Sequence, residues 1–469
     1  MTLKPRADRR RGMLPFVLKP GEREDVTARA GLPLVTETSR ALRLDEQARE
    51  LFGPPRRKDD YGADEQLETL ATLIAAGGDR VEDIRILAED QGLVRLLGRP
   101  FASPDALLDF LKSFHDPACW ANRPEDKKAF VPSESVKLQA LDKLNGALVL
   151  RAADPNTTTA TIDHDGTIIE SHKRDTLIAY EGTRGYQPLV ATWAEEQLVV
   201  ADEFRDGNVA GGEDPLSSVK RAFGHLPPTV TKRYFRGDSA DYYDPLLKYL
   251  VREQVGFAIS ADMGKELRAV CEGQPPSAWQ PMEKREREQV DVAEVEFTPG
   301  TWAKDAEPLR YIALRFTPLQ NDLFEDATVR YHAVVSNRTD LSPAALIEWH
   351  RGKAGTIEHV HLVLKSELAA GVMPCQLFGA NAAWFRINVL TFNLLTALKR
   401  KALPERYRLA RPKRLRCSPC PANWPSTRVS SPCRYPPTTL ASKRSLRLAS
   451  ALSRCSSPRP PDRWRPRTR

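Results

Sequence analysis

The most constraining feature of this chain is the stretch Thr-Ile-Asp-His-Asp-Gly-Thr-Ile-Ile-Glu at residues 161–170, in which β-branched residues surround two carboxylates. Asp163 and Asp165 are two residues apart, so in a strand both side chains point to one face of the sheet. Carboxylates within a strand are costly unless something positive binds there, and a divalent cation is the usual partner. A turn at a strand end, with Asp and Gly166 as turn formers, explains this stretch alone equally well.

Length and composition indicate a globular protein. The chain has 469 residues, which is enough for two or three domains, with 41% hydrophobic and 28% charged residues. No apolar run approaches the roughly 18 residues of a membrane helix. The basic start leads into no apolar segment, which argues against a secretory signal. Seven cysteines without a framework spacing favour a reducing cytoplasm.

The net charge of +8 is unevenly distributed. Residues 417–469 contain eleven Lys or Arg and a single acid, which gives this segment +10 and leaves about −2 for residues 1–416. The pI of about 9.1 is therefore weak evidence that the folded body binds nucleic acid. Any DNA-binding function has to come from local sites.

The first third of the chain is expected to be helical after a flexible start. Residues 1–60, rich in Arg, Lys, Pro and Gly, are predicted to form a basic arm. Helical periodicity and capping signals then predict a small helical DNA-binding domain at 61–155. Its helices are expected from 64 to 77, at 81–89, 93–97, 103–114 and 133–150.

Residues 156–415 follow an α/β pattern. Three strands in a meander are followed by helix, strand, helix and strand, which predicts a mixed sheet. Residues 180–186 are interpreted as a hairpin loop. The strands are expected at 161–169, 188–193, 197–204, 230–236 and 256–260, and the helices at 216–223 and 242–253.

An insertion interrupts this pattern. Residues 265–328 contain a charge run and alternating segments at 290–297, 301–303 and 309–316, which predict a β-rich subdomain packed on one edge of the core. A strand at 329–337 then returns to the core.

Two further acids follow the first pair. Asp238 comes directly after the strand at 230–236. Glu358 lies on a helix that runs to residue 370 and is interrupted at Gly355; its buried stripe comprises Ile357, Val360, Leu364 and Leu368. Glu358 and Lys365 are seven residues apart, so they lie nearly in line beside that stripe. A pair of ordinary surface charges is the alternative. A long helix is expected at 380–402.

The last segment, 416–469, is rich in Arg, Ser, Pro and Cys and has no periodic apolar face, which predicts disorder. We interpret the abrupt change as a shifted reading frame. The alternative is a genuine basic arm that binds DNA phosphates. A metal knuckle at Cys417 and Cys420 is disfavoured, because no second pair follows at zinc-site spacing.

As a set, these segments resemble the DDE transposases of bacterial insertion sequences, in the group with an RNase H-like core and a β-subdomain before the glutamate helix. The resemblance covers roughly residues 100–415. The pieces that carry it are the segments 163–173, 180–188, 201–208, 236–239, 256–260, 355–358 and 381–385, together with Lys365.

The resemblance implies a catalytic triad of Asp165, Asp238 and Glu358 that holds two Mg²⁺ ions, with Mn²⁺ as a substitute and Asp163 as a further metal ligand. Lys365, with Arg351 or Lys353, would bind DNA phosphates. The family's Tyr position carries Trp349, and neither Arg351 nor Lys353 has the usual spacing. Trp349 or Trp384 could stack on an extruded base, although a core role is favoured.

The function implied is cut-and-paste transposition. The enzyme would cleave and join strands at the terminal inverted repeats of its element and insert them into target DNA, as a homodimer in the synaptic complex, in the cytoplasm and associated with the nucleoid. Three alternatives stay open: an RNase H-like nuclease without strand transfer, a catalytically defective DNA-binding remnant, and a zinc enzyme using Glu358, His359 and His361. The zinc site is disfavoured because neighbouring helical side chains diverge.

Overall fold

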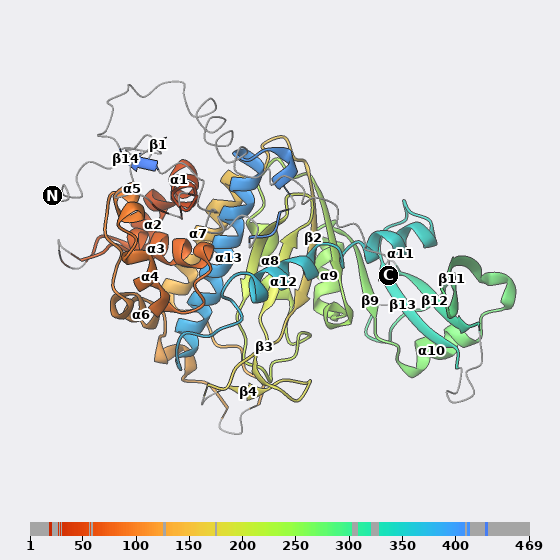
Figure 1. The fold of residues 1–469 in the computed structure, drawn as a ribbon. Coiled ribbons are helices and arrows are strands. Elements are labelled where there is room, and N and C mark those ends of the chain that lie inside the picture. Colours follow the sequence, from red (N-terminus) through yellow and green to blue (C-terminus); the bar gives the residue numbers. More distant parts are fainter. Residues whose placement is uncertain are drawn as a thin grey trace, which may run out of the picture.

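The structure, a computed structural model, is shown in Figure 1. It describes residues 18–20, 27, 29, 31–55, 57, 60–124, 128–173, 176–302, 308–319, 328–408, 410–412 and 427–429. Most of the beginning of the predicted arm and most of the predicted tail lie outside these residues. The described parts of the two segments include β1 (Leu18–Pro20) and β14 (Thr427–Val429), which pair antiparallel.

A group of helices precedes the sheet and lies at one end of the molecule (Figure 1). The arm expected over residues 1–60 is wrong for residues 33–52, which form two amphipathic helices with buried side chains such as Val35 and Ala48. These helices pack against α3 and α7 and so bury apolar surface that the helical group needs covered. The helices are α1 (Pro33–Ala41), α2 (Leu44–Phe52), α3 (Ala63–Ala76), α4 (Ile84–Ala88), α5 (Gln91–Leu97), α6 (Pro104–Lys112) and α7 (Val136–Ala152).

Local capping sets the ends of several of these helices. The backbone N–H of Gly62 donates to the Glu65 carboxylate at the start of α3, and Gly77 ends that helix with φ +93°. Ser103 and Ser135 accept hydrogen bonds from the first turns of α6 and α7. The cap at Ser103 confirms the predicted start of α6, whereas α7 begins at Val136, three residues after the predicted start at 133, because Ser135 caps it.

A nine-stranded mixed sheet forms the core, in the order β10-β11-β12-β13-β9-β8-β2-β6-β7. β2 pairs parallel with β8 and antiparallel with β6, while β8 pairs parallel with β9. This arrangement confirms the expected RNase H-like mixed sheet. The five strands that the sequence predicted for this part of the sheet are β2 (Thr159–Gly166), β6 (Leu189–Trp193), β7 (Leu198–Glu203), β8 (Lys232–Gly237) and β9 (Gly256–Ala261).

The insertion extends this same sheet. β13 (Arg330–Ser336) pairs antiparallel with β9, and β12 (Arg310–Pro318), β11 (Glu288–Val295) and β10 (Gln280–Lys284) continue the ladder outward. A helix that the alternating pattern did not predict, α10 (Lys265–Glu272), leads into these strands. Residues 301 and 302, expected in a strand, lie in a turn instead.

Helices cover both faces of the core. α8 (Leu216–Gly224) and α9 (Asp244–Arg252) lie on one face, and α12 (Ile357–Ser366) lies against β2 and β6 on the other, after α11 (Pro343–Arg351). α13 (Phe378–Lys401) is buried along most of its length, because it runs between the helical group and β7 (Figure 1).

The hairpin predicted at 180–186 is found in part, since residues 179–183 connect two antiparallel strands, while residues 184–186 form the second of these strands. β2 ends at Gly166, and a separate three-stranded sheet follows in the order β3-β5-β4. Its strands are β3 (Ile169–Glu170), β4 (Leu177–Ile178) and β5 (Arg184–Tyr186). A Cβ on Gly185 would lie 2.0 Å from the Ile169 carbonyl oxygen, so the close approach of β5 to β3 requires glycine at this position.

Candidate active site

The register of two parallel strands brings two of the predicted acids together. Asp163 on β2 pairs with Arg236 on β8, so Asp165, at the end of β2, lies level with Asp238, just past the end of β8. The carboxyl ends of parallel neighbours meet at one edge of a sheet, which is where open α/β sheets bind ligands. The Asp238 side chain also accepts a hydrogen bond from the Ala240 N–H at 3.0 Å, which holds it at this edge.

One ammonium group lies beside both carboxylates. Lys353 Nζ is 3.7 Å from Asp165 Oδ2 and 3.9 Å from Asp238 Oδ2. Burial raises the pKa of Asp165 to about 6; Lys353 opposes this rise, and the neighbouring Asp238 carboxylate adds to it. The site therefore concentrates negative charge that a single lysine balances only in part.

Asp163 has a different environment from Asp165 although both point to the same face. It is fully buried, and its two oxygens accept hydrogen bonds from Arg236 Nε at 2.6 Å and Nη2 at 2.8 Å. Thr356 Oγ1 also donates to Asp163 Oδ2. Both oxygens of Asp163, which the sequence predicted as a metal ligand, therefore already accept hydrogen bonds. In this structure Asp163 forms a buried ion pair with Arg236 instead.

The connection between α11 and α12 is anchored to the end of β8. Arg236 Nη1 donates to the Trp349 carbonyl at 2.7 Å, and His350 Nε2 donates to the Gly237 carbonyl at 2.9 Å. A Cβ on Gly352 would lie 2.4 Å from Arg236 Nη1. This connection brings Lys353 to the two aspartates.

The third predicted acid is not joined to the first two. Glu358 lies in the first turn of α12 and is exposed. Among the described residues, no group of three or more His, Cys, Asp or Glu side chains is arranged to hold a metal ion. The structure thus assembles two of the three predicted carboxylates.

The predicted DNA-binding cations are dispersed. Lys353 lies at the aspartates, and Arg351 Nη1 forms an ion pair with Glu283 of β10 at 2.9 Å. Lys365 Nζ donates to the Ile168 carbonyl at 3.3 Å, just beyond β2. Lys365 therefore lies on the same side of the sheet as the acidic pair, whereas Arg351 ties the insertion to α11.

The two tryptophans considered for base stacking have different surroundings. Trp384 is fully buried and donates its indole N–H to the Ala369 carbonyl at 2.9 Å, as a core residue does. Trp349 is half-buried, between the guanidinium groups of Arg236 and Arg338, whose carbon atoms lie 5.5 Å and 4.5 Å from its ring centre.

Sequence reasoning considered His361 only as a ligand of the disfavoured zinc site with Glu358 and His359, and did not place it beside Asp165. Its Nε2 lies 3.9 Å from Asp165 Oδ2, from one turn beyond Glu358 on α12. Position 361 is four residues after Ile357, so it belongs to the buried stripe already visible in the sequence. A histidine within an apolar stripe was the available signal, but only the packing of α12 on β2 shows what it faces.

A second histidine supports β2 from the opposite face. His164 Nδ1 lies 2.7 Å from Asp241 Oδ1, and its Nε2 lies 3.3 Å from Ser218 Oγ on α8. All three residues are buried. This chain of hydrogen bonds joins the strand that carries Asp165 to the segment that follows Asp238.

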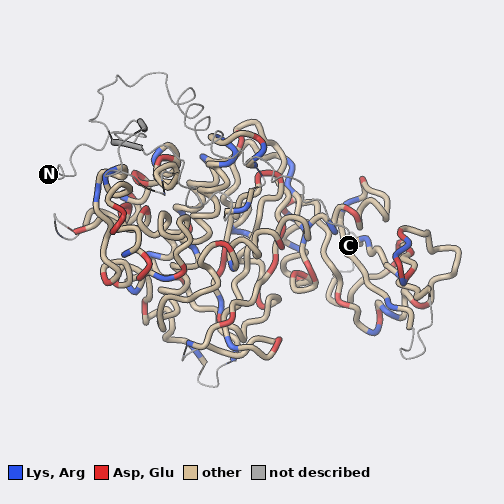
Figure 2. The backbone as a smooth tube through the Cα atoms, in the orientation of Figure 1, with Lys and Arg blue, Asp and Glu red and all other residues tan. Residues whose placement is uncertain are grey.

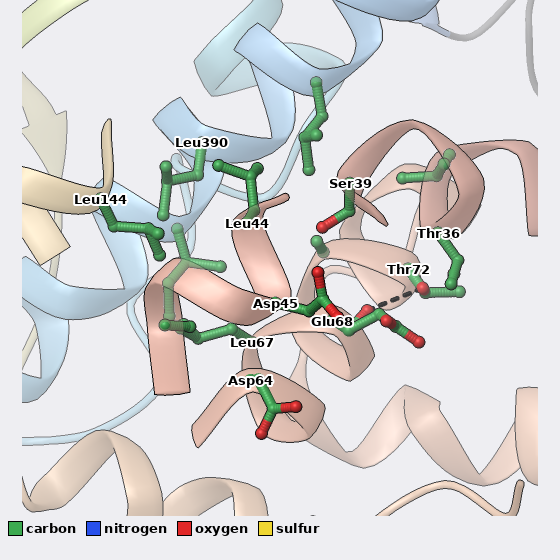
Figure 3. Close-up of a pocket in the computed structure, with 15 residues that line it drawn as sticks. Thr36, Ser39, Leu44, Asp45, Asp64, Leu67, Glu68, Thr72, Leu144 and Leu390 are labelled. Carbon is green, nitrogen blue, oxygen red and sulfur yellow. Dashed lines mark hydrogen bonds between the residues drawn. The ribbon is translucent and has the colours of Figure 1, made fainter. Parts of the chain in front are cut away.

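Cavities elsewhere do not compete with this site. Figure 3 shows a pocket of about 30 Å³ in the helical group, where Thr72 donates to the Glu68 carbonyl; it has room for roughly one water molecule. A larger cavity of about 460 Å³ lies at the junction of α7, α8 and α13. Among its charged lining residues, Arg221 and Arg386 both form ion pairs with Glu134.

Parallel strands that each bring an aspartate to one edge of an RNase H-like sheet, followed by a helix with a glutamate, define the DDE class of enzymes. The chain belongs to the family described as transposase DDE domain group 1, whose model matches residues 20–418. It is a DNA transposase, an enzyme whose partner is DNA. Every helix in the described part of the chain is too short or too polar to span a membrane.

A solved structure of the piggyBac transposase, in a synaptic complex with hairpin DNA, is similar to this chain with a TM-score of 0.46 and 12% identity, over 85% of this chain and 81% of that one. No curated protein matches this sequence.

Proposed function

We propose that this transposase cleaves and joins strands at the ends of its element by metal-assisted phosphoryl transfer, with Asp165, Asp238 and Glu358 as catalytic carboxylates. The observation that carries the proposal is the position of Asp165 and Asp238 around the Lys353 ammonium. Two carboxylates that share one cation in this way form the kind of site that binds a divalent ion.

The residues present fit a divalent cation. Asp165 and Asp238 supply hard oxygen ligands, and the pKa of Asp165, raised by burial and by Asp238, indicates a site that gains from additional positive charge. The family generally uses divalent metal ions; we propose Mg²⁺, two ions in the assembled site, with Mn²⁺ as a substitute. Such ions activate the attacking hydroxyl and stabilise the leaving oxygen.

The chain's own residues then have separate tasks. Asp165 and Asp238 would hold the cation at the sheet edge, and Glu358 would complete the carboxylate set from α12. Lys353 balances the aspartates when no other cation is bound. Lys365 contacts a DNA phosphate beside Ile168, where its Nζ already lies. We leave Asp163 out of the ligand set because Arg236 and Thr356 occupy its oxygens.

DNA recognition is assigned to local surfaces, because charges of both signs are interspersed along the described chain (Figure 2). The helical group at residues 61–155 is proposed to bind the terminal inverted repeats, and the sheet edge to bind the reacting strand. A homodimer would pair two ends in the synaptic complex, in association with the nucleoid. A nuclease without strand transfer, or a remnant that only binds DNA, are the competing functions.

A cleavage and joining assay on DNA that carries the parent element's ends tests the proposal. With Mg²⁺ the wild type should cleave and then join the ends to target DNA, and EDTA should stop both steps. Asp165→Asn should lower the cleavage rate by at least 10³-fold while end binding persists, because only the metal-holding charge is removed.

The matched control is Asp340→Asn, which removes a charge from an exposed loop residue and should leave cleavage unchanged. Cleavage without joining would favour the nuclease. End binding without cleavage in the wild type would favour the remnant. Cleavage by Asp165→Asn at the wild-type rate would refute the assignment of Asp165.

A further inference from the structure

His361 is the polar side chain of α12 that faces the acidic pair. Only 8% of its surface is exposed, and its Nε2 lies 3.9 Å from Asp165 Oδ2. Its neighbours on the helix, Glu358 and His359, are exposed. The packing of α12 against β2 therefore directs His361, rather than Glu358, toward Asp165 in this structure.

We propose that His361 is a ligand of the divalent cation held by Asp165 and Asp238, through its Nε2. The inference rests on the proposed function, since it requires a cation at the two aspartates, but it adds a nitrogen ligand to what the carboxylates supply.

The distance between the two atoms is compatible with a shared ion. Metal–ligand bonds to imidazole nitrogen and to carboxylate oxygen are about 2.0–2.2 Å long, so two atoms on one ion are at most about 4.3 Å apart. The 3.9 Å between His361 Nε2 and Asp165 Oδ2 is below this limit. Both ligands can therefore reach one ion once the side chains rearrange, since His361, Asp165 and Asp238 do not form a ready metal geometry among the described residues.

The hydrogen bonding of His361 also favours a ligand role. Neither ring nitrogen has a hydrogen-bond partner within the described residues, although both are buried. A buried polar atom left unpaired costs about 1–3 kcal/mol. A leucine at this position of the apolar stripe would avoid the cost, so a purely structural role does not account for an imidazole here.

The surrounding charges keep the imidazole available. Burial lowers the pKa of His361, and the neighbouring Lys365 and Lys353 charges lower it further. A neutral ring has a lone pair to donate, as metal ligation requires. The ring is thus a nitrogen donor aimed at a carboxylate that needs a cation.

A nitrogen ligand predicts a metal preference. Imidazole suits transition metals, whereas carboxylate and water ligands suit Mg²⁺, so His361 should raise the affinity for Mn²⁺ more than that for Mg²⁺. His361→Gln should weaken Mn²⁺ binding at least tenfold and should change Mg²⁺ binding less.

The test uses the full chain, without a histidine tag, titrated with Mn²⁺ in the presence of end DNA. Binding is followed by calorimetry, and electron spin echo modulation detects nitrogen bound to Mn²⁺. The wild type should show imidazole nitrogen coupling, which His361→Gln should remove. The matched control, His359→Gln, changes an exposed histidine on the same helix and should keep both the coupling and the affinity.

The outcomes separate this inference from the proposed function. If the wild type binds Mn²⁺ in an Asp165-dependent manner without nitrogen coupling, His361 is not a ligand, although the carboxylate site stands. Nitrogen coupling that survives in His361→Gln has the same consequence. If the wild type binds no Mn²⁺ at all, or binds it equally well after Asp165→Asn, both the inference and the proposed metal site are wrong.

Discussion

At the scale of single residues, Asp163 and Asp165 show how burial separates two identical side chains on one strand. Asp163 is fully buried and its charge is matched by Arg236, while Asp165 shares Lys353 with Asp238 at the open edge of the sheet. A buried charge without its partner is strongly destabilising. The Asp163–Arg236 pair therefore supports the site by holding the strand and the α11–α12 connection together.

Arg236→Met should lower the free energy of unfolding by about 3–5 kcal/mol, because it leaves the Asp163 charge uncompensated. Urea denaturation measures the change. Lys248→Met, which breaks an exposed ion pair with Asp244, is the control and should cost less than about 1 kcal/mol. Similar values for the two variants would show that Asp163 is not held as a buried ion.

At the scale of elements, the active site depends on how β8 continues into the segment that carries Asp238. Gly237 separates the strand from this segment and packs against Asp241, the partner of His164. A Cβ on Gly237 would lie 2.3 Å from Asp241 Oδ2 and 2.7 Å from Asp241 Cβ. The clash involves atoms close to the backbone, so the segment itself has to move.

Gly237→Ala should therefore weaken DNA cleavage at least tenfold and cost about 1–3 kcal/mol of stability, as overpacking does. Gly224→Ala at the end of α8 is the control, since a Cβ there meets no atom within 4 Å. Cleavage rates and thermal unfolding report the two effects. Wild-type cleavage by Gly237→Ala would mean that the position of Asp238 tolerates this movement.

Another contact between elements joins α7 to the residue after α8. His225 Nε2 lies 3.4 Å from Asp142 Oδ2, and its Nδ1 donates to the Val200 carbonyl at 2.7 Å. Burial opposes the charge on each partner, yet their mutual hydrogen bond raises the pKa of His225 and lowers the pKa of Asp142. Each shift favours the charged form of its group.

The stability from His225 should be complete below pH 6.5, its ordinary pKa, and should be lost as the pH rises through the higher pKa of the folded state. Urea unfolding between pH 6 and 9 should show this decline. His225→Gln should flatten it, while His172→Gln, at an exposed histidine, should not. A decline that persists in His225→Gln would assign the effect to another group.

At the scale of the whole molecule, three parts share one continuous set of contacts: the helical group, the RNase H-like sheet and the insertion that extends it. Arg386 on α13 is fully enclosed and bridges Glu134, which precedes α7, to Asp202 on β7. The insertion is joined to the core sheet through the β9–β13 ladder and to α11 through the Arg351–Glu283 ion pair. Proteolytic release of the insertion with an intact core would argue against this continuity.

The tail after Arg416 remains a prediction at this scale. The family match ends at residue 418, where the composition changes. If the reading frame is shifted, translating the gene in the other two frames beyond the codon for Arg416 should yield a basic, helical continuation. Hydrogen exchange should then show no protection past about residue 417. The absence of such a continuation in both frames would leave a genuine basic arm.

Local chemistry determined much of this protein from its sequence alone. The periodicity, caps and turns predicted β2, β8, α6, α13 and the β-rich insertion, and the position of Asp165 on one strand and of Asp238 directly after another predicted their meeting. Long-range packing decided the rest. Residues 33–52 became helices because α3 and α7 offer them an apolar surface, and Asp163 became an ion-pair partner because β8 places Arg236 beside it. His361 faces Asp165 only because α12 packs on β2, and no spacing within the sequence encodes that contact.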